Sequence, residues 1–283
     1  MKPYVFTGGT TVVTGAGSGI GEALTYALAA RGSHLVLVDQ HADRLERVAL
    51  TVRTEHPDLR VRPVVADLAD HDATVELGTR LAAEHPETTL LVNNAGVTVG
   101  GELAELTLAE LDRVLEVDLR AVISLTHGLL PVLLGNPGSH VVVVSSIFGI
   151  FAAPGQVPYV TAKFGVRGFA EALRHELAGR VGVTVVHPGG VATRIAADTP
   201  VGEHADRATF DVTRARVTGL LRIPAAVAAG AILRGVERRR GRVLVGWVTS
   251  RLPDLLVRAL PGTYGRVIGA FAGTRLDPRV APD

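Results

Sequence analysis

The feature that most constrains the fold is a repeated alternation of short apolar runs with longer amphipathic stretches. The apolar runs are rich in Val and Leu along their whole length, which is typical of strands covered on both faces of a parallel sheet. The sequence therefore predicts seven strands, at residues 10–14, 34–39, 60–65, 89–93, 140–145, 181–187 and 242–245.

The stretches between these runs predict helices that cover both faces of the sheet. They lie at residues 20–31, 42–55, 72–85, 158–178 and 224–237, with two further helical segments between 107 and 134. Parallel strands that alternate with helices are joined by right-handed crossovers. The expected fold class is therefore α/β: a doubly wound, Rossmann-type, mostly parallel seven-stranded sheet in a single domain. Such a sheet binds ligands at the carboxyl ends of its strands.

The expected domain covers residues 1–247, and an apolar C-terminal extension, 248–283, follows it. Pro253 and Pro261 interrupt this extension, which we expect to pack on the domain or on a neighbouring subunit. No uninterrupted apolar run reaches the roughly 20 residues that a membrane-spanning helix needs. We therefore expect no membrane span and a cytoplasmic protein.

The composition of the 283-residue chain excludes several classes of protein. The absence of cysteine excludes a disulfide framework, thiolate metal sites and a cysteine nucleophile. A formal net charge of +1 gives no overall field that would attract nucleic acid. The histidines lack the spacing of metal ligands, so no metal site is expected.

A glycine-rich loop connects the first strand to the first helix, where residues 14–21 read TGAGSGIG. Glycines at such a turn let the backbone approach a diphosphate closely, and the helix start offers free N–H groups and the positive end of its dipole. A plain glycine-rich turn is the alternative. The pattern predicts a dinucleotide-phosphate site made by Gly15, Gly17, Ser18, Gly19, Ile20 and Gly21.

This loop resembles that of the short-chain dehydrogenase/reductase family, in its single-domain branch. The resemblance extends from about Thr10 to Arg242, because the family's other motifs follow in the expected order. It implies a nicotinamide dinucleotide cofactor and a small-molecule substrate. It also implies further cofactor contacts at Asp67, Leu68, Asn94, Ala95, Gly96, Pro188, Gly189, Val191 and Thr193.

Asp39, at the end of the second predicted strand, indicates NAD as the cofactor. An acid at this place accepts hydrogen bonds from both adenosine-ribose hydroxyls and repels a 2′-phosphate. In the sequence, no arginine or lysine lies within the loop or next to Asp39 to bind that phosphate. The alternative is that Asp39 only caps the helix that follows.

Tyr159 and Lys163 are the strongest catalytic candidates. A spacing of four residues places them on one face of a helix, and Lys163 is one of only two lysines among 29 cationic residues. A compact ammonium favours the phenolate of a nearby tyrosine, whose free pKa is about 10. The resemblance implies that both also contact the cofactor. It selects Ser146, thirteen residues before Tyr159, as the catalytic serine over Ser145.

Asp118 departs from the family's pattern, because it occupies the place of a catalytic asparagine. This change puts the family's water-mediated proton relay in doubt. His187 is a possible base, but a structural role is expected of it.

The expected function is hydride transfer between NAD(H) and a secondary alcohol or ketone with an apolar body. The alternatives are an NADP(H)-dependent ketoacyl-type reductase and a catalytically weak NAD-binding sensor or scaffold. The resemblance also implies a homodimer or homotetramer, with the helices at 107–134 and 158–178 as interfaces.

Overall fold

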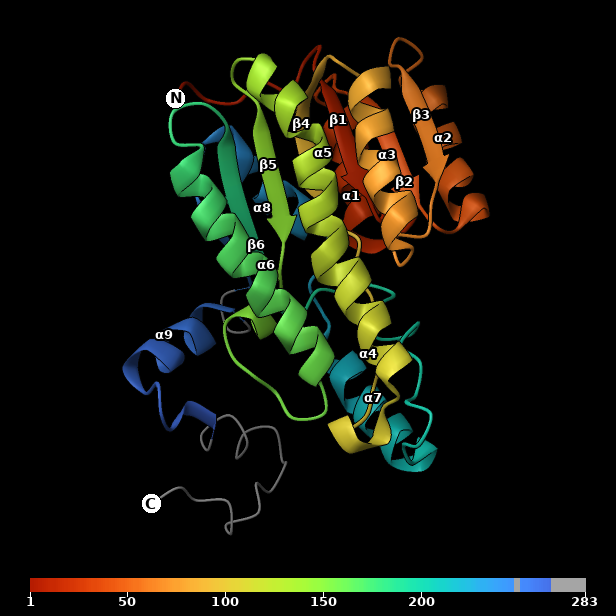
Figure 1. Cartoon of the computed structure of the whole chain (residues 1–283), viewed down its shortest axis with the longest axis vertical. Coiled ribbons are helices and arrows are strands. Elements are labelled where there is room, and N and C mark those ends of the chain that lie inside the picture. The colour runs from red at the N-terminus through yellow and green to blue at the C-terminus, as the bar shows by residue number, and fades with distance from the viewer. Residues whose placement is uncertain (247–249, 266–283) are drawn as a thin grey trace.

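The computed structural model describes residues 1–246 and 250–265 (Figure 1). Its centre is a parallel seven-stranded sheet in the order β3-β2-β1-β4-β5-β6-β7, which confirms the predicted fold class and single domain. The strand order reverses between β1 and β4, where a doubly wound sheet binds its ligand. The strands are β1 (Thr10–Thr14), β2 (His34–Asp39), β3 (Val61–Val65), β4 (Thr88–Asn93), β5 (His140–Val144), β6 (Gly182–Pro188) and β7 (Arg242–Val245).

Each face of the sheet carries its own apolar core, because consecutive strand residues point to opposite faces. On β1, Val13 packs with helices α1, α2 and α8, whereas Val12 packs with α3, α5 and α6. Figure 1 shows α3, α5 and α6 in front of the sheet. The helices are α1 (Gly19–Ala29), α2 (Ala42–Glu55), α3 (His71–Glu84), α4 (Leu108–Leu115), α5 (Ala121–Gly135), α6 (Val157–Glu176) and α8 (Ala225–Glu237).

The two helical segments expected between 107 and 134 form one run, because a π-helical turn, Glu116–Arg120, joins α4 to α5. This run, Leu108–Gly135, is long and apolar enough to cross a membrane by length and composition alone. However, 44% of its most apolar window is buried inside the protein, and α5 packs on α3 and the sheet. A core helix passes the same test, so the run is weak evidence for a membrane span.

Two helices lie in regions for which the sequence predicted none. Helix α7 (Arg207–Leu220) has no buried residue, and helix α9 (Leu252–Ala259) belongs to the C-terminal extension. Both lie toward the end of the molecule where the strands have their carboxyl ends (Figure 1). The expected boundary at residue 247 and the end of the extension fall outside the described residues, so this division of the chain stays a prediction.

Candidate active site

The glycine-rich loop ends β1 and opens α1 at the carboxyl edge of the sheet. Gly19 begins the helix with φ +57, a conformation that glycine adopts without strain. Ser18 is the N-cap residue, and its side chain makes no capping hydrogen bond, so the first amides of α1 stay open to a ligand. A cavity of about 500 Å³ lies here, lined among others by Gly17, Ser18, Gly19 and Thr193. This cradle fits a dinucleotide diphosphate.

Asp39 ties the loop to the end of β2. One carboxylate oxygen accepts a hydrogen bond from the Gly17 N–H at 2.9 Å, and the other accepts one from the His41 N–H at 2.9 Å. Helix α2 has His41 as its N-cap residue, so Asp39 is not its cap. The carboxylate therefore lies beside the phosphate loop, as expected for an acid that contacts a ribose.

The structure corrects the expectation that no cation lies near Asp39. Arg44 and Arg47 extend from α2 and line the same cavity as the loop. Arg44 forms an ion pair with Asp198 at 3.3 Å, and Arg47 forms one with Glu22 at 2.7 Å. Arg44 and Arg47 follow Asp39 by five and eight residues in the sequence. They lie on one face of α2, and this face brings both side chains next to the loop.

The segment after β4 supports the loop from the neighbouring strand. The Asn94 side-chain amide donates to the carbonyl oxygens of Thr14 at 2.9 Å and Gly15 at 3.3 Å. The Ala95 N–H donates to the Thr14 hydroxyl at 3.0 Å. A Cβ atom at Gly96 would lie 3.0 Å from Asp118 Oδ2 and 3.3 Å from Lys163 Nζ, so a side chain there would require these buried groups to shift.

The other expected cofactor residues lie along the same edge. Asp67 accepts from the Ala69 N–H at 3.0 Å and pairs with Arg113 at 3.4 Å, while the neighbouring Leu68 is buried. After β6, the Gly189 N–H donates to the Val245 carbonyl at 3.1 Å. Val191 forms a bridge with Ile223, which brings Thr193 to the cavity.

Tyr159 and Lys163 lie in the first two turns of α6, and the Lys163 ammonium is 5.3 Å from the centre of the Tyr159 ring. Burial raises the pKa of the Tyr159 phenol. The Lys163 charge and a hydrogen bond with Ser146 lower it, whereas the Asp118 charge raises it further. The phenol therefore titrates under the influence of three groups that the sequence had singled out.

Asp118 pairs directly with Lys163. The two charged groups are 2.9 Å apart, and both side chains are almost fully buried. The second carboxylate oxygen accepts from the Val97 N–H at 2.6 Å. Burial alone would lower the pKa of the Lys163 ammonium, but the Asp118 carboxylate outweighs this effect and raises that pKa. Lys163 also donates to the Val144 carbonyl at 3.3 Å.

The two candidate serines have different surroundings. The Ser145 hydroxyl donates a hydrogen bond to the Lys163 carbonyl at 2.8 Å, and this bond joins α6 to the end of β5. The Ser146 hydroxyl accepts from the Phe148 N–H at 3.1 Å and interacts with Tyr159. The His187 ring donates from Nδ1 to the Ser146 carbonyl at 2.9 Å. Burial lowers the pKa of His187 to about 4, so the ring is neutral at neutral pH.

Apolar side chains pack against Tyr159. Tyr159 packs against a small core formed by Val99, Leu106 and Val114. The Phe148 ring meets the Tyr159 ring edge-on, with the two ring centroids 6.2 Å apart. A backbone bridge closes over this region. The Gly100 N–H donates to the Pro200 carbonyl at 3.0 Å, and the Gly202 N–H donates to the Gly100 carbonyl at 2.8 Å.

Known proteins share this architecture. A family model described as short chain dehydrogenase matches residues 9–203. SadH of Mycobacterium tuberculosis, which carries the name of an oxidoreductase, is 36% identical over 269 residues, covering 94% of this chain and 95% of that protein.

Solved structures agree at the level of the fold. A short-chain dehydrogenase/reductase from Burkholderia phymatum in complex with NAD has a TM-score of 0.79 at 24% identity, over 99% of this chain and 100% of that one. A short-chain dehydrogenase from Burkholderia cenocepacia in complex with NADP has a TM-score of 0.72 at 28% identity, over 85% and 97%. The chain therefore belongs to the short-chain dehydrogenase/reductase family of oxidoreductases.

Proposed function

We propose that this enzyme transfers a hydride between NAD(H) and a secondary alcohol or ketone with an apolar body. The observation that carries the proposal is the convergence of Tyr159, Lys163 and Ser146 next to the segment after β4 that supports the glycine-rich loop. Carbonyl reduction needs from a protein a proton donor, a cation that tunes its pKa, and a hydroxyl beside the donor.

The cofactor would lie along the carboxyl edge of the sheet. Its diphosphate would be held by residues 15–21 and the first amides of α1, its adenosine ribose by Asp39, and its nicotinamide end by residues 188–193. When bound, the nicotinamide supplies or accepts the hydride. The Lys163 side chain would orient the nicotinamide ribose.

The protein's own groups handle the substrate proton. In oxidation, the Tyr159 phenolate takes the proton of the substrate hydroxyl, and in reduction the Tyr159 phenol returns it. The Ser146 hydroxyl donates a hydrogen bond to the substrate oxygen and stabilises negative charge that develops there. Lys163 favours the phenolate, and Asp118 opposes it through partial cancellation of the lysine charge.

The apolar surroundings of Tyr159 support a substrate with an apolar body. Val99, Leu106 and Phe148 lie around the phenol and offer no charge to a substrate. A ketone or secondary alcohol with alkyl or aryl substituents would match them.

The choice between NAD(H) and NADP(H) depends on the opposing effects of Asp39 and of two arginines, Arg44 and Arg47. The Asp39 carboxylate beside the loop favours NAD(H) through repulsion of a 2′-phosphate. Arg44 and Arg47 favour the second candidate, an NADP(H)-dependent reductase, but each is paired with an acid. We expect kcat/KM for NADH to exceed that for NADPH, and Asp39→Ala to reduce the difference. Equal values in the wild type would contradict this assignment.

The test of the function is NADH fluorescence titration combined with turnover on a panel of ketones. Binding with turnover of apolar ketones supports the proposal. Turnover restricted to ketoacyl thioesters with NADPH would indicate the ketoacyl-type reductase. NADH binding without any turnover would indicate a sensor or scaffold.

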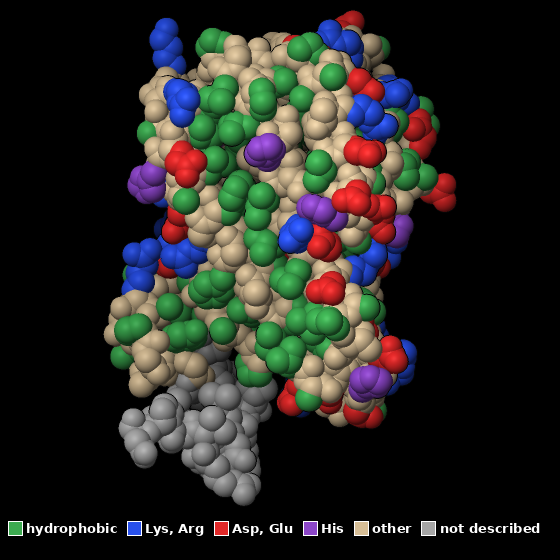
Figure 2. Space-filling view, in the orientation of Figure 1, with side chains coloured by type: hydrophobic (Ala, Val, Ile, Leu, Met, Phe, Trp, Pro, Cys, Tyr) green, Lys and Arg blue, Asp and Glu red, His purple; other side chains and the backbone are tan. Residues whose placement is uncertain are grey.

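We further propose a cytoplasmic homodimer or homotetramer assembled through α5 and α6. Figure 2 shows hydrophobic side chains spread over the face that these helices form. Ile123, Leu134 and Phe164 are each about two-fifths exposed there. Phe164→Asp should place a charge in the interface and shift the mass measured by light scattering toward the monomer. A wild type that is itself monomeric would contradict the proposal.

A further inference from the structure

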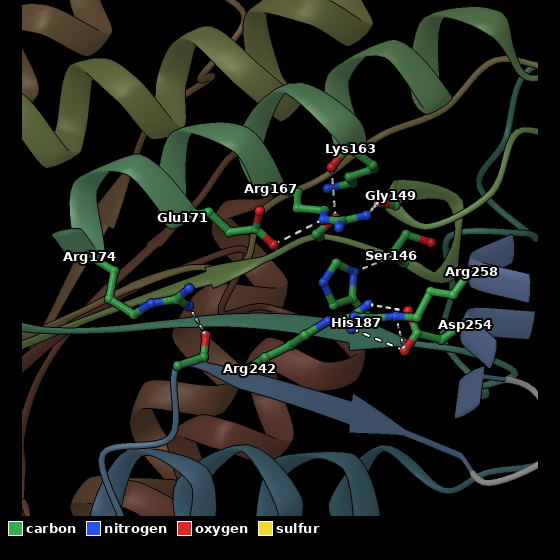
Figure 3. Close-up of polar contacts among 12 residues, drawn as sticks. Ser146, Gly149, Lys163, Arg167, Glu171, Arg174, His187, Arg242, Asp254 and Arg258 are labelled. Atoms are coloured by element: carbon green, nitrogen blue, oxygen red, sulfur yellow. Dashed lines mark hydrogen bonds and ion pairs between the residues drawn. The ribbon is translucent and has the colours of Figure 1, made fainter. Parts of the chain in front are cut away.

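Helix α9, in the C-terminal extension, is joined to strand β7 by a bidentate ion pair between Asp254 and Arg242. The Arg242 guanidinium on β7 donates to both Asp254 oxygens, at 2.7 and 3.1 Å. The side chains are only 21% and 13% exposed, so water screens this pair weakly. Arg258, one turn further along α9, adds a contact to Asp254 at 3.3 Å (Figure 3).

A buried serine makes a second attachment just before α9. The fully buried Ser250 hydroxyl lies 2.6 Å from the Val245 carbonyl oxygen and 3.3 Å from that of His187. Ser250 therefore holds the extension against the ends of β6 and β7. Tyr264 makes a third contact, because its hydroxyl accepts from the Ala152 N–H at 3.4 Å on the loop before α6.

His187 links this attachment to residues 146–151, here called the serine loop, through its hydrogen bond to the Ser146 carbonyl. A carbonyl oxygen only accepts, so the bond to Ser146 fixes the proton on Nδ1 and the orientation of the ring. Figure 3 shows the ring between Ser146 and the Arg242 side chain. His187 Nε2 and Arg242 Nε are buried and have no hydrogen-bond partner among the described residues. The hydrogen bonds of the Arg242 guanidinium therefore go to Asp254, whose carboxylate balances its charge.

The serine loop is thus supported from two sides. On the α6 side, Arg167 donates to the Gly149 carbonyl at 3.1 Å, and Ser145 is bonded to Lys163. On the other side, Asp254 joins α9 to Arg242 on β7, and Ser250 contacts the carbonyl oxygen of His187 on β6. The His187 ring in turn donates to the carbonyl oxygen of Ser146, which follows β5. The first support belongs to the sheet domain, whereas the second includes the C-terminal extension.

We propose that α9 is a positioning element of the active site, in which Asp254, Ser250 and His187 hold the Ser146 loop in its working place. The proposal rests on the function proposed above, because it gives Ser146 its role toward the substrate oxygen. Asp254 and His187 are positioning residues, since their contacts reach Ser146 only through the backbone or through other side chains. The extension then controls how well the substrate oxygen is held.

Asp254→Asn tests the attachment in the full-length enzyme. We expect kcat to fall by about ten- to a hundredfold, because small displacements of catalytic groups have effects of this size. NADH affinity should stay near wild type, since the variant leaves the glycine loop intact. Amide hydrogen exchange should rise in peptides that cover residues 146–151. The charge-swapped pair Arg242→Asp with Asp254→Arg should recover part of both losses.

The matched control is Glu46→Gln, which removes the carboxylate of another arginine pair, Arg53–Glu46 at 2.8 Å on α2. If Asp254→Asn matches this control in kcat and in exchange, the proposal is wrong. A wild type that turns over no substrate would refute the proposed function instead, and the exchange measurement would still decide whether α9 supports the loop.

A pair of His187 variants keeps the proposal testable if Asp254→Asn does not fold. The amide of His187→Asn can still donate to the Ser146 carbonyl, whereas His187→Leu cannot. We expect kcat of the Asn variant to stay close to wild type and that of the Leu variant to fall, with unchanged NADH affinity in both. Equal kcat in the two variants would overturn the role of His187.

Discussion

Both ends of the sheet bury a histidine, but the two rings have different surroundings. At the amino end, Arg239 donates to His140 Nδ1 at 3.0 Å, and His140 Nε2 donates to the Thr184 hydroxyl at 2.8 Å. Thr184 in turn donates to the Arg240 carbonyl at 2.6 Å. At the carboxyl end, His187 uses only Nδ1. The His140 ring therefore satisfies both of its nitrogens inside the protein, whereas the His187 ring keeps Nε2 without a partner among the described residues.

The tyrosines of the two ends should separate function from stability most clearly. Tyr159→Phe removes the proposed proton donor, so we expect kcat to fall by about 10³-fold while NADH binding stays close to wild type. Steady-state kinetics and fluorescence titration measure the two effects. Retention of most activity would contradict the mechanism.

Tyr4→Phe is the matched change at the amino end. The Tyr4 hydroxyl bonds to Thr89 at 2.9 Å, and burial raises its pKa to about 12. We expect this variant to lose about 1 kcal/mol of unfolding free energy and no activity. A large loss of kcat in Tyr4→Phe would end the distinction between the two ends.

Acid should weaken both ends through their histidines. Burial lowers the folded-state pKa of His140 to about 3 and that of His187 to about 4, from an ordinary 6.5. Below pH 6.5 the unfolded chain therefore binds protons that the folded chain does not. The stability that the neutral rings provide is complete above pH 6.5 and falls as the pH falls, by ~1.4 kcal/mol per pH unit for each ring.

His140→Gln isolates the contribution of the amino end. Urea unfolding between pH 6.5 and 4 should show a shallower dependence of the unfolding free energy on pH than in the wild type. Because this interval of 2.5 pH units corresponds to at most ~3.4 kcal/mol per ring, the difference is well above experimental error. An unchanged slope would mean that His140 is already protonated in the folded protein.

A further prediction at the carboxyl end concerns the carboxylate beside Lys163. Asp118→Asn keeps an oxygen for the Val97 N–H but removes the negative charge that raises the pKa of both Lys163 and Tyr159. We expect the apparent pKa in kcat/KM for alcohol oxidation to fall on the order of one pH unit.

Glu116→Gln is the control for this change, since Glu116 lies in the same π-helical turn but pairs with Arg120 at 3.3 Å instead of Lys163. Its pH profile should match that of the wild type. Superimposable profiles for Asp118→Asn and wild type would show that the Asp118 charge does not reach Tyr159. An inactive wild type revived by Asp118→Asn would instead favour the sensor or scaffold.

Features that depend on a single short segment of the chain could be predicted from the sequence. The Val-rich strands, the loop at 14–21 and the four-residue spacing of Tyr159 and Lys163 each occupy one segment, and the structure brings the last two to one edge of the sheet. Helix α7 was missed because its apolar residues, such as Val212 and Leu220, are exposed and give no core-facing period.

Contacts that depend on how distant elements meet were not predictable. The return of Arg44 to the loop depends on which face α2 presents. The π-helical turn that carries Asp118 is a change in backbone hydrogen bonding without a side-chain signature. The Arg242–Asp254 pair depends on the path of the chain after β7, which no residue spacing reveals.

The bridge between Gly100 and Val201 has a consequence for the passage of molecules past Tyr159. Any molecule that passes between these two segments must separate them, which breaks two backbone hydrogen bonds at a net cost of roughly 1–3 kcal/mol. Such a cost permits opening on the microsecond-to-millisecond scale of enzyme loops. Because both bonds join backbone atoms, substitution of side chains on either segment leaves their donors and acceptors in place.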